Sequence, residues 1–352
     1  MKLKHLGYLL IGLFLILLGA VAVIAVQWFN QPMGPTMALS VSANGPAAAV
    51  LAKATPTALQ PAAPTALPSA TSEQKFCGNT GQMMIAVVGS DSNPNVPPPG
   101  SDLVRYVQVD FDSQKVTIYT FPRGLWLDSP DLKDLKIAQT TLGKSYDYRY
   151  RAEEAKANQD GADKETRAVV KAGQTVAQTV LDNFGVRPDH YVVIKLTQLP
   201  KLVDAVGGVT VDNPSYFETN YGEKFIFAEG PVELDGVKMA SYVRFADATH
   251  SDWERIARQN LVLNALTKKL EDPATLSMIP NFFKELADSF VTDLSAENIT
   301  DLTCVLKSVK DENTIKEQVH SEDVKPGPEP LSFLPDVEKI IAQLKGLGFV
   351  KE

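Results

Sequence analysis

The sequence predicts one α/β domain with a central sheet, because short apolar strands alternate with helical segments along most of the chain. Residues 83–88, MMIAVV, form a continuous apolar run of the kind found in a buried central strand. Residues 103–111 and 115–121 alternate with period two around a short turn and predict a hairpin. Residues 252–270 place their apolar positions in one arc of a helix.

The chain begins with a hydrophobic segment that predicts a membrane anchor. Leu6 to Val26 is a run of 21 uncharged residues, and one bilayer crossing needs about 20. Lys2 and Lys4 precede it and favour an N-terminus on the inner side. A cleaved signal peptide is the alternative, since alanines near the end of the run fit a small-residue cleavage site. In either case we expect the rest of the chain to be extracytoplasmic.

Composition divides the chain into three parts. Residues 1–30 are expected to be a cytoplasmic tip and transmembrane anchor. Residues 31–75 are rich in Ala, Pro and Thr with few charges, and such a segment predicts an extended linker. Residues 76–352 carry the strand and helix patterns and are expected to fold as a single domain with C-terminal helices.

The charge balance and the few sulfur and imidazole ligands restrict the function. The chain has 34 basic and 42 acidic residues, and this acidic balance argues against a nucleic-acid partner. Export permits a disulfide between its two cysteines, Cys77 and Cys304, although two independent thiols remain the alternative. The four histidines form no ligand pair, so zinc is not expected.

Two aspartates are predicted to flank one loop at the edge of the sheet. The strand at 83–88 runs into Asp91, and the proline-rich segment after it ends at Asp102. Carboxylates at strand ends can hold magnesium, although an Asx turn or a helix cap is the alternative for each. Arg123 follows the second hairpin strand and is expected at the same edge.

The middle of the chain predicts further strands and helices. Residues 146–176 are expected to form an exposed loop, followed by a helix with Ala177, Val180, Leu181 and Phe184 facing inward. A solvated face is the favoured interpretation of Arg149 and Arg151, and contact with a polymer is the alternative. The remaining pattern predicts strands at 190–196 and 207–211, a helical turn at 199–206, and helices at 261–270, 282–290, 299–309 and 335–344. Whether the tail packs on the same domain stays open.

The helix predicted from Asp252 carries donors on its buried arc. Ser251 and Glu254 match a capping box that starts it. Arg255 and Gln259 project into the apolar arc, with Arg258 at its margin, and a helix N-terminus favours an anion. An arginine paired with a buried carboxylate is the alternative for Arg255 alone. Together with Arg244, these residues predict an anion pocket.

An ordered series of motifs resembles the LytR-CpsA-Psr enzymes of bacterial cell-wall assembly. The motifs are GSDS at 89–92, SDL at 101–103, FPR at 121–123, LKI at 135–137, LVDAVGGVTV at 202–211, LDGVKMASYVR at 234–244, DWERIARQ at 252–259 and VTDLS at 291–295. This resemblance implies an α-β-α arrangement around a central mixed sheet, with an apolar tunnel for a lipid that the helix after Gln259 could line.

The resemblance also implies a function and roles for the residues. Members of the family are membrane-anchored phosphotransferases that move a glycopolymer from a polyprenyl pyrophosphate carrier to peptidoglycan, and pyrophosphatase activity is a possible side reaction. By resemblance, Asp91 and Asp102 hold magnesium. Lys136 and Arg258 bind phosphate, and the catalytic groups are Arg123, Arg244, Arg255 and Gln259.

Four positions depart from the family pattern. Gly100 stands where the family usually has Arg, Gly124 where it has Asp, Ala138 where it has Asn, and Ala246 where it has Arg. Asp247, Arg105 or Arg151 are candidates to compensate. The sequence therefore supports an active transferase first. A catalytically weakened relative that binds polyprenyl-linked or wall polymer as a scaffold is the alternative, followed by an unrelated anchored phosphatase or a plain interaction domain.

Overall fold

The computed structural model describes residues 29–40, 45–53, 77–91, 100–156, 164–195, 199–219, 223–245, 252–271 and 290–350. The predicted anchor at Leu6 to Val26 lies outside these residues, as do the capping serine Ser251 and nearly all of the helix predicted at 282–290. Among the helices that the structure describes, none has the length and apolar character needed to cross a bilayer.

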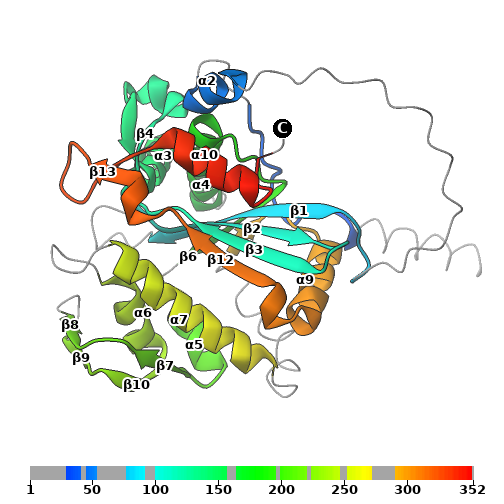
Figure 1. Cartoon of the computed structure of the whole chain (residues 1–352), viewed down its shortest axis with the longest axis vertical. Helices are drawn as coiled ribbons and strands as arrows, with labels where there is room; N and C mark the ends of the chain where they lie inside the picture. The colour runs from blue at the N-terminus through cyan, green and yellow to red at the C-terminus, as the bar shows by residue number, and fades with distance from the viewer. Residues whose placement is uncertain are drawn as a thin grey trace, which may run out of the picture.

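A six-stranded mixed sheet forms the centre of the molecule, in the order β11-β6-β1-β2-β3-β12 (Figure 1). Its strands are β1 (Gln82–Asp91), β2 (Gly100–Asp110), β3 (Lys115–Thr120), β6 (His190–Lys195), β11 (Phe290–Thr292) and β12 (Thr314–Gln318). Pairs β1–β6 and β3–β12 are parallel, and the other three pairs are antiparallel. The predicted hairpin, the central strand and the mixed α/β class are thereby confirmed.

Helices cover both faces of this sheet (Figure 1). On one face, α3 (Leu142–Ala155), α4 (Lys164–Phe184) and α10 (Val337–Gly346) enclose the main core, which includes Tyr106, Tyr119 and Phe121. On the other face, α9 (Ala296–Ser308) packs on a second apolar cluster. The helix α7 (Asp252–Glu271) lies on this same face of the sheet. Alternate residues of each strand point to opposite faces, so the sheet separates these two environments.

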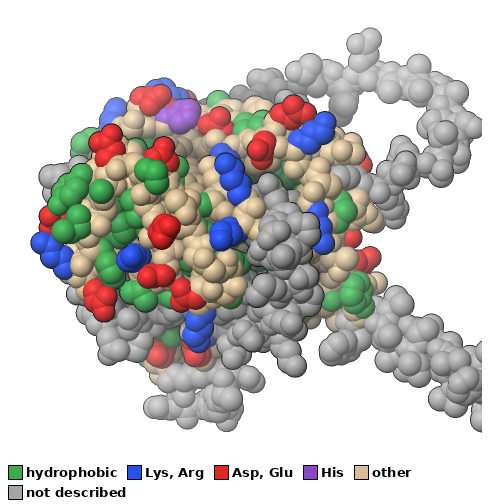
Figure 2. Space-filling view, turned by 90° about the horizontal axis from the view of Figure 1, so that it is seen from below, with side chains coloured by type: hydrophobic (Ala, Val, Ile, Leu, Met, Phe, Trp, Pro, Cys, Tyr) green, Lys and Arg blue, Asp and Glu red, His purple; other side chains and the backbone are tan. Residues whose placement is uncertain are grey.

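A smaller layer packs against α7 on the side away from the sheet. Its elements are α5 (Leu199–Ala205), β7 (Val209–Asn213), β8 (Phe217–Thr219), β9 (Phe225–Phe227), β10 (Gly230–Leu234) and α6 (Gly236–Arg244). Its separate core joins Phe217, Phe227 and Tyr242 to Val262 of α7. The molecule seen from below shows acidic, basic and apolar side chains interspersed on the described surface (Figure 2).

The segment after the predicted hairpin corrects one prediction. Residues 146–155 form most of α3 instead of an exposed loop, and Tyr146 in this helix is fully buried. Arg149 is buried rather than solvated, because it pairs with Asp134 at 2.9 Å and Glu153 at 3.5 Å. Asp134 lies in the short helix η1 (Pro130–Leu135), and Glu153 lies in α3 itself. The strand pair β4 (Trp126–Asp128) and β5 (Gln139–Thr141) flanks η1 in the sequence.

The predicted linker also differs from the structure where it is described. Residues 33–40 lie along the domain: the Tyr191 hydroxyl donates to the Pro35 carbonyl at 2.9 Å, and the Met33 N–H donates to the Leu294 carbonyl at 3.1 Å. The helix α2 (Pro46–Lys53) buries Ala47 against the main core. Small apolar side chains let this Ala- and Pro-rich segment pack closely, so its first half is part of the folded unit.

The C-terminal tail completes the same domain. β12 pairs with β3, and α10 buries Ile340, Ile341 and Leu344 in the main core. The pair β13 (Val324–Pro326) and β14 (Phe333–Pro335) lies between them in sequence. Cys77 and Cys304 form a disulfide that ties the entry of β1 to α9, so the bonded alternative is the one realised.

Candidate functional site

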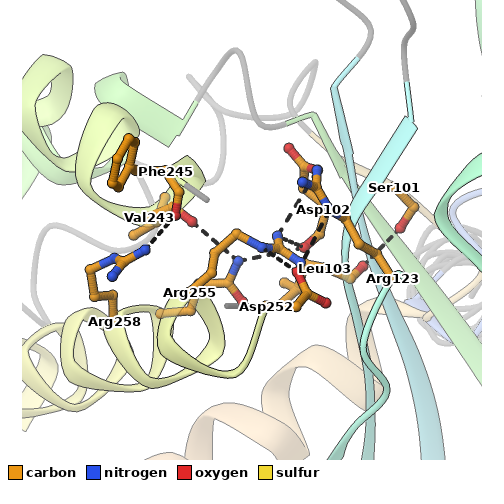
Figure 3. Close-up of polar contacts among 10 residues, drawn as sticks. Ser101, Asp102, Leu103, Arg123, Val243, Phe245, Asp252, Arg255 and Arg258 are labelled. Atoms are coloured by element: carbon orange, nitrogen blue, oxygen red, sulfur yellow. Dashed lines mark hydrogen bonds and ion pairs between the residues drawn. The ribbon is translucent and has the colours of Figure 1, made fainter. Parts of the chain in front are cut away.

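A β-bulge positions Asp102 at the edge of the sheet. In the pairing of β1 with β2, Gly89 lies opposite Leu103 and Ser90 opposite Ser101, so Asp102 has no partner across the ladder. An extra residue of this kind bends a strand and redirects its side chain. The Asp102 carboxylate is 14% exposed and turns toward Arg123 and the first turn of α7 (Figure 3).

Arg123 bridges two carboxylates from different elements. Its Nη1 donates to Oδ1 of Asp102, and its Nε lies 3.7 Å from Oδ1 of Asp252. The first turn of α3 holds the loop that carries Arg123, because the Gly143 N–H donates to the Arg123 carbonyl at 2.8 Å. The guanidinium is therefore oriented by fixed partners while its side chain stays 35% exposed.

Arg255 is the most deeply buried charged residue of the cluster, at 1% exposure. Its Nε and Nη2 donate to Oδ1 of Asp252 at 2.8 and 2.6 Å, and its Nη1 donates to the backbone carbonyl of Asp102. The inward orientation that the helical arc predicts is confirmed. The alternative of a carboxylate partner is also realised, by Asp252 three residues earlier on the same helix face.

The other donors of α7 join it to the end of α6. Gln259 donates to the Val243 carbonyl at 3.3 Å and lies 3.5 Å from the Asp102 carbonyl. Arg258 donates to the Tyr242 and Phe245 carbonyls, and its guanidinium stacks 4.7 Å from the Phe217 ring centre. In Figure 3 the Arg258 guanidinium reaches the end of α6 at Phe245 and lies apart from Asp102, so the contacts seen for it attach α6 to α7.

The remaining predicted residues differ in how closely the structure brings them to this cluster. Arg244 is the last residue of α6, directly after Val243, whose carbonyl receives Gln259. The backbone of Asp91 ends β1 opposite Gly100, two residues from Asp102, while its side chain lies outside the described part. Lys136 is exposed at the end of η1 and, within the described residues, makes no hydrogen bond or ion pair with the cluster.

Asp252 is the site residue that sequence reasoning missed, since it was considered only as the start of the helix. The spacing of three residues between Asp252 and Arg255 was the available signal, because such residues share a helix face. Its carboxylate is 9% exposed and lies between the two arginines. Within the described part, its Oδ2 is buried without a hydrogen-bond partner.

The cluster contains the oxygen ligands that a hard cation prefers, but the predicted pair of magnesium ligands is not fully described. Among the described residues no three His, Cys, Asp or Glu side chains gather as a metal site. The carboxylate of Asp102 and the unpartnered Oδ2 of Asp252 are acceptors of the type that magnesium takes. The residues present therefore fit magnesium by their chemistry.

An apolar strip of the sheet lies on the α7 and α9 side, next to these charges. Its side chains are only partly buried, whereas the residues that alternate with them on the opposite face, such as Ala86, Val88 and Tyr106, are fully buried. The strip consists of Val87, Val107, Ile118, Val192 and Ile194. The site thus combines cationic groups at a strand end with a neighbouring apolar surface.

Comparisons with known proteins concern the family and the fold of the chain. A model of the LytR_cpsA_psr family matches residues 51–330. The polyisoprenyl-teichoic acid–peptidoglycan teichoic acid transferase TagU of Enterococcus faecalis is 29% identical over 139 residues, which are 39% of this chain and 45% of the relative. The chain spans about half the length of the first curated relatives that it matches.

Solved structures show the same fold. The crystal structure of Bacillus subtilis TagV has a TM-score of 0.58 at 18% identity and covers 78% of this chain and 100% of its own. A structure described as TagT bound to LI-WTA has a TM-score of 0.51 at 16% identity and covers 76% of this chain and 90% of its own. At these identities the likeness concerns the α/β fold around the central mixed sheet.

Proposed function

The chain belongs to the LytR_cpsA_psr family, and we propose that it is a membrane-anchored phosphotransferase that moves a glycopolymer from a polyprenyl pyrophosphate carrier to peptidoglycan. The names of the relatives support this reaction class, because TagU is a teichoic acid transferase acting between a polyisoprenyl-linked polymer and peptidoglycan. The TagT structure further supports a wall polymer as the bound partner.

One observation carries the proposal: Arg123 and Arg255 converge on Asp102 beside a partly exposed apolar strip of the sheet. A polyprenyl pyrophosphate has the matching chemistry, with anionic phosphates at one end and a long apolar chain at the other. Guanidinium groups bind phosphate oxygens through their planar fork of donors. The partly exposed valines and isoleucines offer apolar surface that a lipid chain would cover.

The proposed reaction breaks the phosphoanhydride bond of the pyrophosphate and forms a new phosphate ester bond. A hydroxyl oxygen of the peptidoglycan acceptor attacks the phosphorus that bears the glycopolymer, the bond to the bridging oxygen breaks, and polyprenyl phosphate leaves with that oxygen. The acceptor proton passes to solvent or to a carboxylate of the site. The product is a phosphodiester between polymer and peptidoglycan, and no oxidant or reductant is needed.

The chain's own residues would act mainly through charge. Arg123 and Arg255 would hold the phosphate oxygens and stabilise the negative charge that spreads over the transferred group. Asp252 and Asp102 orient these guanidinium groups before substrate arrives, so little reorganisation is needed at the moment of reaction. Gln259 and Arg244 would contribute from the junction of α6 and α7. Asp102 and Asp91 would hold magnesium, and the bound ion would supply positive charge next to the pyrophosphate.

The proposal includes a location that follows from the sequence. The apolar run from Leu6 to Val26 would anchor the chain in the cell membrane with its N-terminus inside and the α/β domain outside. This arrangement keeps the phosphate site near the bilayer that contains a polyprenyl carrier. Fractionation of cells with a protease-accessibility assay tests it, and protection of the domain from external protease would contradict it.

An assay of the full-length protein in detergent tests the function. A polyprenyl pyrophosphate-linked glycan and peptidoglycan would be supplied with magnesium, and transfer to peptidoglycan and release of polyprenyl phosphate would be measured. We expect Arg255→Ala and Asp102→Asn to lower turnover by roughly 10²- to 10³-fold, the usual effect of removing one charge-stabilising group. Arg151→Ala is the control, because Arg151 is 52% exposed and pairs with Asp147 away from the cluster. Equal turnover in all four proteins would refute the assignment.

A second candidate, a weakened relative that binds polymer without transferring it, is favoured by the packing at Gly124. A Cβ atom there would come within 2.4 Å of the Leu331 carbonyl oxygen and 2.8 Å of the Phe333 ring. The aspartate that the family carries at this position therefore does not fit here. This candidate predicts donor binding by calorimetry without turnover, and magnesium-dependent release of polyprenyl phosphate would count against it.

A further inference from the structure

Arg105 is a buried charge on an otherwise apolar part of the sheet. It lies in the middle of β2, opposite Val87 of β1 and Thr120 of β3, and is 5% exposed. Its neighbours in the strand, Val104 and Tyr106, belong to the main core on the other face. The alternation of β2 therefore directs Arg105 to the face on which α7 and α9 lie, within the apolar strip.

The described part of the protein leaves two donors of the Arg105 guanidinium without a hydrogen-bond partner. Its Nε and Nη2 are buried and have no hydrogen-bond partner among the described residues, and none of those residues forms an ion pair with it. Gln318 lies in the same row of the sheet, two strands across, and its Oε1 likewise has no partner in the described part. A buried cation without a carboxylate partner destabilises a fold, so the burial of Arg105 requires an explanation.

Arg149 shows how the same chain treats a structural arginine. Its side chain is 8% exposed, and three carboxylates surround it: Asp134 at 2.9 Å, Glu153 at 3.5 Å and Asp131 at 3.7 Å. The two arginines have similar burial, but within the described residues carboxylates neutralise Arg149 and none forms an ion pair with Arg105. This contrast separates Arg105 from the arginines that hold the fold together.

The surroundings of Arg105 destabilise its positive charge as long as no anion binds next to it. Burial, assisted by the nearby charge of Arg255, lowers the pKa of Arg105 to about 10. The group remains protonated at neutral pH, because that value lies well above 7. Lys316 of β12 adds a further positive charge to the same side of the sheet. Burial lowers the pKa of this lysine, the charge of Asp311 opposes that shift, and the charge of Arg105 adds to it. Three cationic groups from β2, β12 and α7 thus face one region.

We infer that Arg105 is a further ligand of the carrier pyrophosphate, which it binds from the sheet side while Arg255 binds from α7. The inference rests on the proposed function and adds a residue to its site. A phosphate oxygen would satisfy the unpartnered Nε and Nη2 donors and would separate the like charges of Arg105 and Arg255. The guanidinium on the sheet would also supply a donor that the site lacks at Gly100.

Calorimetric titration of the full-length protein with inorganic pyrophosphate and magnesium tests the inference, together with thermal unfolding of the ligand-free protein. We expect Arg105→Met to weaken pyrophosphate binding by about 10- to 100-fold, the usual loss for charge-assisted hydrogen bonds. Its unfolding temperature should stay the same or rise, because an unpaired buried cation is replaced by an apolar side chain of similar length. The matched control, Arg149→Met, should unfold at a lower temperature and bind pyrophosphate as the wild type does.

Four outcomes decide between the alternatives. Undiminished pyrophosphate binding by Arg105→Met would overturn the inference. A fall in both affinity and unfolding temperature would make Arg105 a structural residue and would overturn it as well. Absence of binding by the wild type would overturn the inference together with the phosphate site. Arg105-dependent binding by a protein that transfers no polymer would support the inference while the proposed transferase function fails.

Discussion

The side chains of the candidate site are held by one another before any ligand arrives. Asp252 receives two hydrogen bonds from Arg255 and lies 3.7 Å from Arg123, which in turn binds Asp102. Removal of one member would leave a buried charge without its partner, which costs about 3–5 kcal/mol in a well-buried pair. Substitutions inside the cluster therefore alter stability and function together. Substitutions of the glycines at its edge allow the effect on stability to be measured apart from the effect on function.

The two glycines that replace family residues, Gly100 and Gly124, should respond differently when the family residue is restored. A Cβ at Gly100 would lie 3.6 Å from its nearest neighbour, the Gly143 carbonyl oxygen, which is an ordinary contact. We expect Gly100→Arg to leave stability nearly unchanged and to strengthen pyrophosphate binding. Gly124→Asp should destabilise the protein by roughly 1–3 kcal/mol, because the tail would have to move. Urea unfolding and calorimetry check both, and equal stability of the two variants would contradict the packing argument.

The sequence predicted the site residues whose position depends on local geometry. Arg255 and Gln259 fall on the buried arc of one helix, and Asp102 and Arg123 lie at strand ends of one hairpin, so pattern and spacing sufficed. The role of Asp252 depends on where the guanidinium groups of Arg255 and Arg123 meet, which requires the docking of α7 on the sheet. For the same reason, the exposure of Lys136 at the end of η1 was not evident from its motif.

At the scale of elements, the tail supports the first turn of α7. The Trp253 ring packs edge-on against Phe333 at 4.7 Å, and its Nε1 donates to the Val319 carbonyl at 2.9 Å. The Phe333 N–H donates to the Gly124 carbonyl at 2.8 Å, next to Arg123. The segment from β12 to β14 thereby fixes the two elements that carry the arginines of the site.

The disulfide makes a second link between distant elements. Cys77 and Cys304 join the start of β1 to α9 across 227 residues of sequence. Because a cross-link of this length restricts the unfolded chain, we expect Cys304→Ser to lower the free energy of unfolding by about 2–5 kcal/mol. Unfolding of the wild type with and without reductant is the control, and it should reproduce the loss. A variant as stable as the oxidised protein would show that the bond contributes nothing.

Element prediction failed where tertiary contacts override composition. The strand β12, TIKEQ, contains two adjacent charged residues, lies at the edge of the sheet and pairs in parallel with β3, far away in sequence. Nothing local distinguishes it from an exposed tail. The charged composition of residues 146–155 predicts a loop, whereas the structure forms most of α3 there. The burial of Arg149 depends on Asp131 and Asp134 of η1, which only the fold brings close.

At the scale of the whole molecule, buried tyrosines in both cores make the stability of the protein depend on pH. Tyr106 and Tyr119 lie in the main core, Tyr191 lies in β6, and Tyr242 lies in the core of the smaller layer. Burial raises the pKa of Tyr242 to about 12 and raises the pKa of the other three still further from the ordinary value near 10. Neighbouring carboxylates contribute to the shift at Tyr119 and Tyr191.

These shifts predict alkaline unfolding with a definite sign. Above pH ~10 the unfolded chain releases tyrosine protons that the folded protein retains, so stability is full below that pH and falls as pH rises. Each buried tyrosine should contribute a loss of roughly 1.4 kcal/mol per pH unit until its folded pKa is reached. The ultraviolet absorbance of tyrosinate, followed together with circular dichroism, should rise at the pH where the fold is lost.

Tyr106 and Tyr119 provide a matched pair for this prediction. The Tyr106 hydroxyl is buried without a partner among the described residues, so Tyr106→Phe should cost little at neutral pH and should shift alkaline unfolding to higher pH. The Tyr119 hydroxyl donates to Oε1 of Gln343 at 2.6 Å, so Tyr119→Phe should lose about 1 kcal/mol at neutral pH while giving a similar alkaline shift. Alkaline midpoints that stay at the wild-type value in both variants would mean that buried tyrosines do not govern the transition.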